Sequence, residues 1–166
     1  MSLPDLRSFI ECLEQHGELA RVKAEVDPNQ EIAIIQQRVL AAGGPALLFE
    51  NVKGSPYRVV SNLFGTPARV ERVFGRPPAE IGNRLASLAG ELMSPSFSAL
   101  WRNRSSLWGL LNARLRNVRY GPVLEETFEP PSLTRLPCLT CWPLDGGPFF
   151  TLPLVHTTDP RTGRGN

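Results

Sequence analysis

The chain has 166 residues and an apolar share of 42%, which suit one medium globular domain, or a small domain and part of a second. Its net charge of +2 is too small to indicate a nucleic-acid partner. No apolar run is long enough for a transmembrane helix, and the N-terminus lacks the basic start and long apolar core of a secretory signal. We therefore expect a cytoplasmic protein.

Helices are predicted wherever apolar residues repeat at intervals of three and four between a capping residue and a glycine or proline. Four segments fit this pattern, and they begin around Ser2 and Asp5, at Asp27-Pro28, at Thr66-Pro67 and just past Pro77-Pro78. Their expected ends are Gly17, Gly43-Gly44, Gly75 and Pro95. The next segment, FSALWRNRSSLWGLLNARLRNV, is expected to continue as partly helical, with Trp101, Trp108 and Leu111 as packing anchors.

Strands are predicted between these helices. The stretch ARVKAEV (20–26) alternates apolar and charged residues, which is typical of a half-buried strand. ALLFE (46–50) and YRVVSNLF (57–64) read as two further strands joined by a turn. Up to about residue 118 we therefore expect an α/β layer domain of mixed order. Its expected core, buried together, comprises Phe9, Leu13, Ile32, Ile35, Leu48 and Phe49.

The composition changes from Tyr120 onward, where prolines, threonines and short apolar runs replace the helical periodicity. LEETFEP, LPCLTCWP and FFTLPLVHTT look like successive strands, and DPRTGRG looks like a turn. Asn166 would then open the returning strand of a hairpin. An unfinished hairpin leaves its outgoing strand with exposed hydrogen-bonding groups, so the sequence looks truncated.

Cys138 and Cys141 in CLTC have the spacing of a metal knuckle or a redox pair. The chain has three cysteines in all, too few for a four-cysteine zinc site, and neither His16 nor His156 has metal-ligand spacing to a cysteine. A redox pair normally lies at a helix N-terminus, whereas Pro137 precedes this one in a region of strand and turn. These observations favour a structural role over metal binding or redox chemistry.

Other catalytic patterns are missing from the sequence. GGP at 43–45 and DGGP at 145–148 lack the lysine and the spacing of a phosphate-binding loop, and no serine lies in a G-x-S-x-G elbow. Glu125, Glu126 and Glu129 could do acid/base work, but a solvated edge is the favoured interpretation.

Five stretches in order carry a family resemblance: DLRSFIECLEQHGELARV, AGGPALLFENVKG, SNLFGTPARV, LPCLTCWPLDGGPFFT and DPRTGRGN. With them the chain resembles the N-terminal portion of the UbiD-type decarboxylases, the polyprenyl-hydroxybenzoate carboxy-lyase family of ubiquinone biosynthesis. The resemblance implies an α/β domain at 1–118. It also implies that 119–166 begins an incomplete, flavin-binding split β-barrel of flavin-reductase-like type. TCWP leads into a barrel strand, so the cysteines would be structural.

The resemblance also implies a chemistry. Enzymes of this family decarboxylate aromatic or α,β-unsaturated acids reversibly and non-oxidatively with prenylated FMN, and a divalent metal, usually Mn²⁺, bridges protein oxygens to the flavin phosphate. Asn166 matches an asparagine whose amide oxygen ligates that metal, and Thr151 matches a threonine that touches the cofactor. An ordinary strand threonine and a frayed terminal asparagine are the alternatives. No catalytic residue is expected within the chain.

The resemblance therefore predicts an N-terminal fragment that is inactive alone, from a parent that acts on a small carboxylic acid and assembles as a homo-oligomer, a dimer or hexamer. Two other functions remain open. The chain could be a non-catalytic assembly or interaction module, or a flavin-binding protein without decarboxylase activity.

Overall fold

The computed structural model describes residues 3, 5–93, 101, 104, 108, 119–121 and 124–166. The chain divides into two compact units. The first, which we call the sheet unit, joins residues 4–65 to 133–166, and the second, the helical unit, comprises 66–132 with the first three residues. The C-terminal segment from 133 onward therefore belongs with the N-terminal sheet.

Helix α1 (Leu6–Gln15) begins at a capping box. The Asp5 carboxylate accepts a 2.8 Å hydrogen bond from the Ser8 backbone N–H, and the Ser8 hydroxyl oxygen accepts one from the Asp5 backbone N–H at 3.2 Å. These two bonds satisfy N–H groups that the first turn of a helix leaves unpaired. The helix ends as predicted, with Gly17 in the left-handed conformation at φ 69°.

A three-stranded sheet is the centre of the sheet unit. Its order is β1 (Leu19–Val26), β2 (Ala46–Val52) and β3 (Val59–Ser61), with β1 parallel and β3 antiparallel to β2. Four successive residues of the central strand, 46–49, are buried, which is typical of a strand covered on both faces. The predicted mixed α/β architecture is confirmed.

Helix α2 (Glu31–Ala41) begins later than the Asp27-Pro28 pair predicts. The Asp27 carboxylate accepts a 2.8 Å bond from the Asn29 backbone N–H and so holds a turn ahead of the helix. The backbone of this turn also pairs with Thr140, whose N–H donates to the Pro28 carbonyl oxygen at 3.2 Å. Because this pairing holds the turn in an extended conformation, the helix begins only at Glu31.

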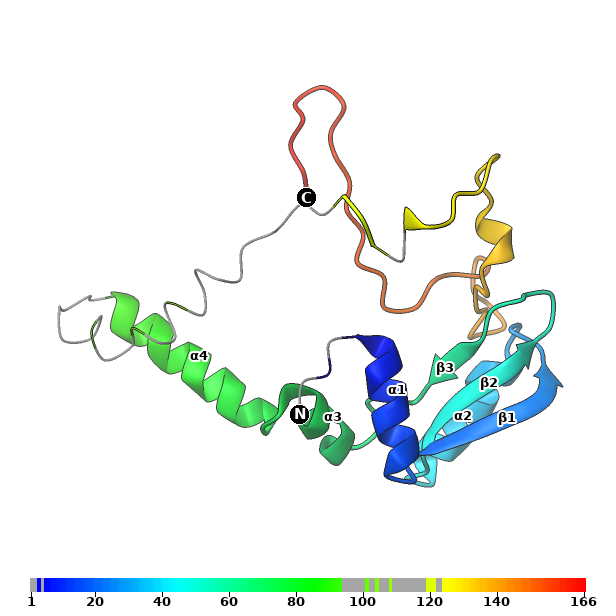
Figure 1. Cartoon of the computed structure of the whole chain (residues 1–166), viewed down its shortest axis with the longest axis horizontal. Helices are drawn as coiled ribbons and strands as arrows, with labels where there is room; N and C mark the ends of the chain where they lie inside the picture. The colour runs from blue at the N-terminus through cyan, green and yellow to red at the C-terminus, as the bar shows by residue number, and fades with distance from the viewer. Residues whose placement is uncertain are drawn as a thin grey trace. The chain divides into compact units, whose positions relative to one another are not determined.

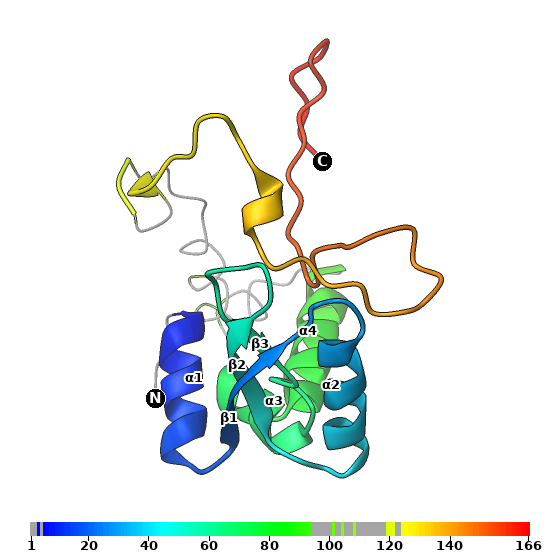
Figure 2. The same ribbon diagram turned by 90° about the vertical axis from the view of Figure 1, so that its right-hand side faces the viewer.

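Two helices cover opposite faces of the sheet (Figures 1 and 2). On the α1 side, Leu48 and Val60 line a hollow together with Leu6 and Ile10. On the α2 side lies the core cluster, which we define as Val26, Ile32, Leu47, Phe49, Val52 and Leu139.

The predicted core is therefore correct in its members and wrong in its arrangement. Phe9, Leu13 and Leu48 are buried, but none of them belongs to the cluster that contains Ile32 and Phe49. Phe9 instead stacks on Phe64, with ring centroids 6.0 Å apart. A three-layer arrangement separates the two sets because neighbouring residues of a strand point to opposite faces.

Strand β1 departs from strict alternation. Its pairing with β2 shifts register between Val22 and Glu25, so that Ala24, predicted to face inward, is exposed. Val26 then returns to the buried side. An extra residue in one strand re-aims the side chains that follow it, which a pattern of period two does not anticipate.

The described part of the helical unit contains α3 (Pro67–Phe74) and α4 (Pro78–Met93). The predicted ends of α3 are confirmed, because the Thr66 hydroxyl caps it and Gly75 closes it in the left-handed conformation. Trp101 and Trp108 are 66% and 68% exposed, so the prediction that they anchor packing is wrong, and Leu111 lies outside the described residues. No helix among the described residues is long and apolar enough to cross a bilayer.

The three strands predicted after Tyr120 do not form in the part of 120–166 that the structure describes. A short 3-10 helix, Leu133–Arg135, and isolated bridges occur instead. A strand requires a neighbour that pairs with its backbone. From Thr151 to Leu154 the extended chain makes no backbone bond to another described residue.

Candidate functional site

A hairpin forms at 157–166. Thr158 and Gly165 make an antiparallel bridge, the Asp159 N–H donates to the Arg164 carbonyl oxygen at 3.0 Å, and the Asn166 N–H donates to the Thr157 carbonyl oxygen at 3.2 Å. The predicted turn is confirmed, and Asn166 lies at the start of its returning arm.

The Asp159 carboxylate organises this turn. It accepts a 2.8 Å bond from the Arg161 backbone N–H and a 2.9 Å bond from the Thr162 hydroxyl. The Arg161 bond, followed by the Thr162 bond, lowers the pKa of Asp159 below its ordinary value. Gly163 supplies the left-handed conformation, with φ 67°, that the turn requires.

The Asn166 side chain is fixed by its own strand partner. Its Oδ1 accepts a 3.0 Å bond from the Thr157 N–H, and its Nδ2 donates to the Val155 carbonyl oxygen at 2.9 Å. An amide oxygen has two lone pairs, so one remains for a ligand, and hard cations such as Mn²⁺ accept such oxygens.

The residues present do not build a metal centre by themselves. No group of three or more His, Cys, Asp or Glu side chains within the described residues could hold an ion. A manganese or magnesium site needs about six oxygen ligands, and Asn166 supplies at most one. The described residues therefore do not fit a complete metal site.

The two cysteines of CLTC line different hollows. Cys138 lines one of about 440 Å³ together with Lys53 and Phe150, whereas Cys141 lines another and packs against the core cluster. The buried Leu139 lies between them in an extended stretch, where neighbouring side chains alternate in direction. Both thiols are free. This placement supports a structural role and opposes joint chelation.

The chemistry of Cys141 agrees with that role. Burial, followed by the nearby Asp145 carboxylate, raises the pKa of its thiol, and metal binding and nucleophilic attack both require the thiolate. The same carboxylate accepts 2.9 Å bonds from the backbone N–H groups of Cys141 and Trp142, so it caps the turn that follows.

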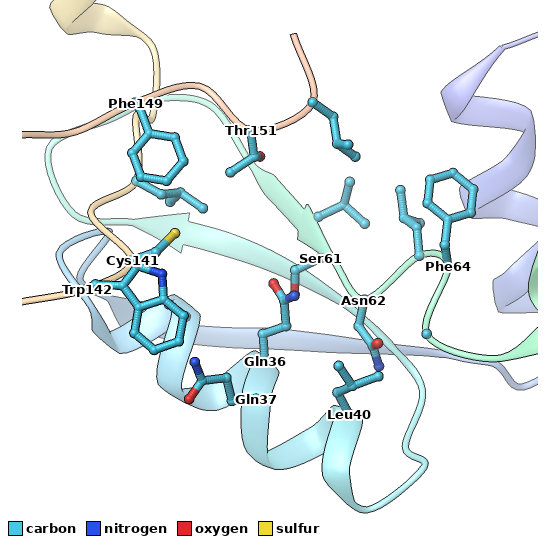
Figure 3. Close-up of a pocket in the computed structure, with 16 residues that line it drawn as sticks. Gln36, Gln37, Leu40, Ser61, Asn62, Phe64, Cys141, Trp142, Phe149 and Thr151 are labelled. Atoms are coloured by element: carbon cyan, nitrogen blue, oxygen red, sulfur yellow. The ribbon is translucent and has the colours of Figure 1, made fainter. Parts of the chain in front are cut away.

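The largest hollow of the sheet unit, which we call the α2–β3 pocket, lies between α2, the end of β3 and residues 139–152 (Figure 3). Its volume is about 580 Å³. Aromatic side chains line it at Phe64, Trp142 and Phe149, and none of its sixteen lining residues is charged. Thr151, exposed to solvent, also lines it, so one of the two predicted cofactor residues opens on this pocket.

Ser61 is a polar group in this pocket that the sequence did not single out. It is 7% exposed, and its hydroxyl oxygen has no hydrogen-bond partner. The next residue, Asn62, is fully engaged as a donor, because its side-chain nitrogen bonds the carbonyl oxygens of Gly44 at 3.2 Å and Pro45 at 2.8 Å. A serine at the inward end of an apolar strand was the only available signal.

These observations define an α/β domain with a C-terminal segment docked on its sheet, a neutral pocket and no metal cluster among the described residues. Two family models match the chain. The 3-octaprenyl-4-hydroxybenzoate carboxy-lyase N-terminal domain matches residues 10–89, and the Rift-related domain of the same carboxy-lyase matches 116–166. The chain belongs to the UbiD family of carboxy-lyases.

Individual relatives agree with this assignment. The chain is 46% identical over 159 residues to an uncharacterized protein of Chlamydia muridarum, covering 95% of this chain and 27% of that protein. It is 41% identical over 155 residues to a 4-hydroxybenzoate decarboxylase protein of Chlamydia pneumoniae, covering 93% and 26%. The chain thus spans about a quarter of the length of these relatives.

Solved structures extend the similarity to the fold. An evolved dimeric form of the UbiD-class enzyme HmfF from Pelotomaculum thermopropionicum, in complex with prFMN, matches with a TM-score of 0.68 at 30% identity, covering 97% of this chain and 34% of that one. The closed form of vanillic acid decarboxylase from Sedimentibacter hydroxybenzoicus matches with a TM-score of 0.69 at 28% identity, covering 97% and 32%.

Proposed function

We propose that the chain is the N-terminal part of a decarboxylase that removes carbon dioxide, reversibly and non-oxidatively, from aromatic or α,β-unsaturated carboxylic acids. The observation that carries the proposal is the match of 97% of the chain to HmfF, a UbiD-class enzyme described in complex with prFMN. The 4-hydroxybenzoate decarboxylase relative supports the same reaction class. Mn²⁺, ubiquinone biosynthesis and a cytoplasmic location stay predictions.

Within that reaction we assign binding roles to two residues. Prenylated FMN, when bound, supplies the electron sink for the departing carbon dioxide. The Thr151 hydroxyl makes no hydrogen bond to another described residue and is exposed, so it is available to such a ligand. The Asn166 oxygen, oriented by its bond from Thr157, would contribute one of several ligands to a metal at the flavin phosphate. This chain offers no catalytic acid or base in our proposal.

The 166-residue chain alone is then inactive, because it provides one side-chain oxygen where a metal site needs about six ligands. The parent protein, which by the length of the relatives is about four times longer, carries the activity. We expect that parent to be a homo-oligomer.

A non-catalytic interaction module is the second candidate, and the exposed apolar side chains of 144–155 favour it. Leu144 is 97% exposed and Leu152 is 86% exposed. Surface of this kind is normally covered by another part of the protein or by a partner.

A paired reconstitution tests the proposal. The 166-residue chain and its full-length parent are each incubated with prenylated FMN and Mn²⁺, and carbon dioxide release, cofactor retention and the visible flavin spectrum are measured. We expect the parent to retain the flavin and turn over, and the short chain to do neither. Turnover by the short chain contradicts its proposed inactivity, and a parent without turnover but with bound flavin supports a flavin-binding protein.

The role of Asn166 is tested in the full-length protein with Asn166→Ala, and Asn51→Ala, at an exposed position of β2, is the matched control. We expect loss of bound Mn²⁺ and of activity only in the first variant. Unchanged metal content in Asn166→Ala removes the proposed ligand role.

A further inference from the structure

We infer that the α2–β3 pocket binds an uncharged aromatic compound that carries one hydroxyl or carbonyl group. Ligand pockets in proteins typically have volumes of about 300–1,000 Å³ and are mostly apolar, with a few placed polar groups. The α2–β3 pocket, at about 580 Å³, meets this description within a single compact unit.

The aromatic part of the assignment rests on the walls. Phe64 follows β3, whereas Trp142 and Phe149 come from the docked C-terminal segment, so rings from distant parts of the chain line one space (Figure 3). Aromatic side chains bind other rings by offset stacking or edge-to-face contact, and such pairs add stabilisation beyond the area that they bury. A flat ring therefore suits this space better than a flexible aliphatic chain.

The polar group of the ligand is assigned by Ser61. Its hydroxyl is more than nine-tenths buried, lines the pocket and has no partner. A buried hydroxyl without a hydrogen bond is costly, so a ligand that pairs with it gains affinity. The amide of Gln36 points toward Ser61 from α2, with Gln37 beside it on the same helix, so donors and acceptors converge on one place (Figure 3).

The neutrality of the ligand follows from what the lining lacks. None of the lining residues is Arg, Lys, His, Asp or Glu. A carboxylate or phosphate that entered would lose hydration and meet no cation, which is strongly unfavourable. The pocket therefore selects against aromatic acids and for neutral phenols, quinones or similar compounds.

This selectivity has a meaning for the reaction proposed above. Loss of carbon dioxide from 4-hydroxybenzoate, with uptake of a proton, leaves phenol, which is neutral at pH 7. The pocket would then hold the product class and exclude the substrate class. That connection rests on the proposed function, whereas the binding itself does not.

The test compares phenol with 4-hydroxybenzoate, which share a ring and a hydroxyl and differ by one carboxylate. Each is titrated into the isotope-labelled 166-residue chain at pH 7, and the Trp142 indole N–H resonance is followed in the Trp101→Phe, Trp108→Phe background, which leaves one of the three tryptophans. We expect phenol to bind at least about tenfold more tightly than 4-hydroxybenzoate, because only the acid must bury an unpaired charge. Equal affinities overturn the inference.

Two variants locate the site. Ser61→Ala should weaken phenol binding by about three- to tenfold, the effect of one neutral hydrogen bond, whereas Ser87→Ala on the exposed surface of α4 should change nothing. Gln37→Arg places a cation in the lining and should raise the affinity for 4-hydroxybenzoate. Unchanged phenol binding in Ser61→Ala contradicts the inference.

The same titration in the full-length protein separates this inference from the proposed function. Phenol binding at Trp142 without decarboxylase activity keeps the inference and removes the proposed function. Decarboxylase activity without phenol binding does the reverse, and it indicates that polypeptide fills the pocket in the longer protein.

Discussion

The carbonyl oxygen of Thr140 accepts a 2.7 Å hydrogen bond from the backbone N–H of Gln30, which joins the C-terminal segment to the turn ahead of α2. Next to this bond, Leu139 enters the core cluster. Backbone pairing and apolar burial thus act at the same place. The docked segment is an integral part of the sheet unit.

Leu139→Ala should therefore destabilise the sheet unit by about 2–4 kcal/mol, because it leaves a cavity in the core cluster. Leu139 is 8% exposed. Urea unfolding measures the change, and Leu144→Ala, at a fully exposed position three residues past Cys141, is the control with an effect within about 0.5 kcal/mol. Equal effects of the two substitutions would mean that the segment is not docked in solution.

Phe9→Ala tests the opposite face of the sheet. Phe9 is buried between α1 and the sheet and stacks on Phe64. We expect a loss of about 3 kcal/mol or more in thermal or urea unfolding. Leu6→Ala, on the exposed side of the same helix, should cost much less. A loss below about 1 kcal/mol for Phe9→Ala would mean that α1 presents another face.

Gly44→Ala tests a close approach at the end of α2. A Cβ atom there would lie 2.7 Å from Val39 Cγ1 and 3.1 Å from the Val39 carbonyl oxygen. We expect destabilisation of about 1–3 kcal/mol, since the backbone oxygen cannot move aside without loss of the helix end. Gly82→Ala in α4, where nothing lies within 4 Å, should be neutral or stabilising. The same outcome at both positions would contradict the packing.

The hairpin should lose stability in acid. Hydrogen bonds to the Asp159 carboxylate lower its pKa below the ordinary 3.8 in the folded turn. The stabilisation is therefore present above that value and is lost as the pH falls below it. The Thr158–Gly165 contact, followed by NMR between pH 6 and pH 2, should weaken over the acid part of this range.

A pair of variants makes this test specific. Asp159→Asn keeps an oxygen that accepts the Arg161 N–H but does not titrate, so its hairpin should show no such loss in acid. Asp159→Ala removes the acceptor and should weaken the hairpin at every pH. A pH dependence that persists in Asp159→Asn assigns the effect to another group.

Features set by neighbouring residues could be predicted from the sequence. Asp5 with Ser8, and Thr66 with Pro67, cap helices through contacts within one turn, and Gly75 ends a helix by its own conformation. The DPRTGRG turn belongs to the same class, since Asp159 bonds groups two and three residues ahead. Local chemistry was sufficient in each case.

Features that depend on distant partners could not be predicted. The late start of α2 follows from the pairing of Pro28 and Gln30 with Thr140. The strand-like segments after Tyr120 lack neighbours among the described residues, so their composition alone misled. In the site, Thr151 and Asn166 came from family resemblance, whereas Ser61 emerged only when three separate segments enclosed it.

The docking of Leu139 also has a consequence for synthesis of the protein. All three strands are complete once Ser61 has been made, yet their α2 face still lacks one of its six core side chains. At about 5–20 residues per second, Leu139 follows Ser61 by about 4 to 16 seconds. During that interval the nascent sheet presents Leu47 and Phe49 to its surroundings with the core incomplete, and chaperone contact with the growing chain is expected to end only when the CLTC segment reaches the sheet.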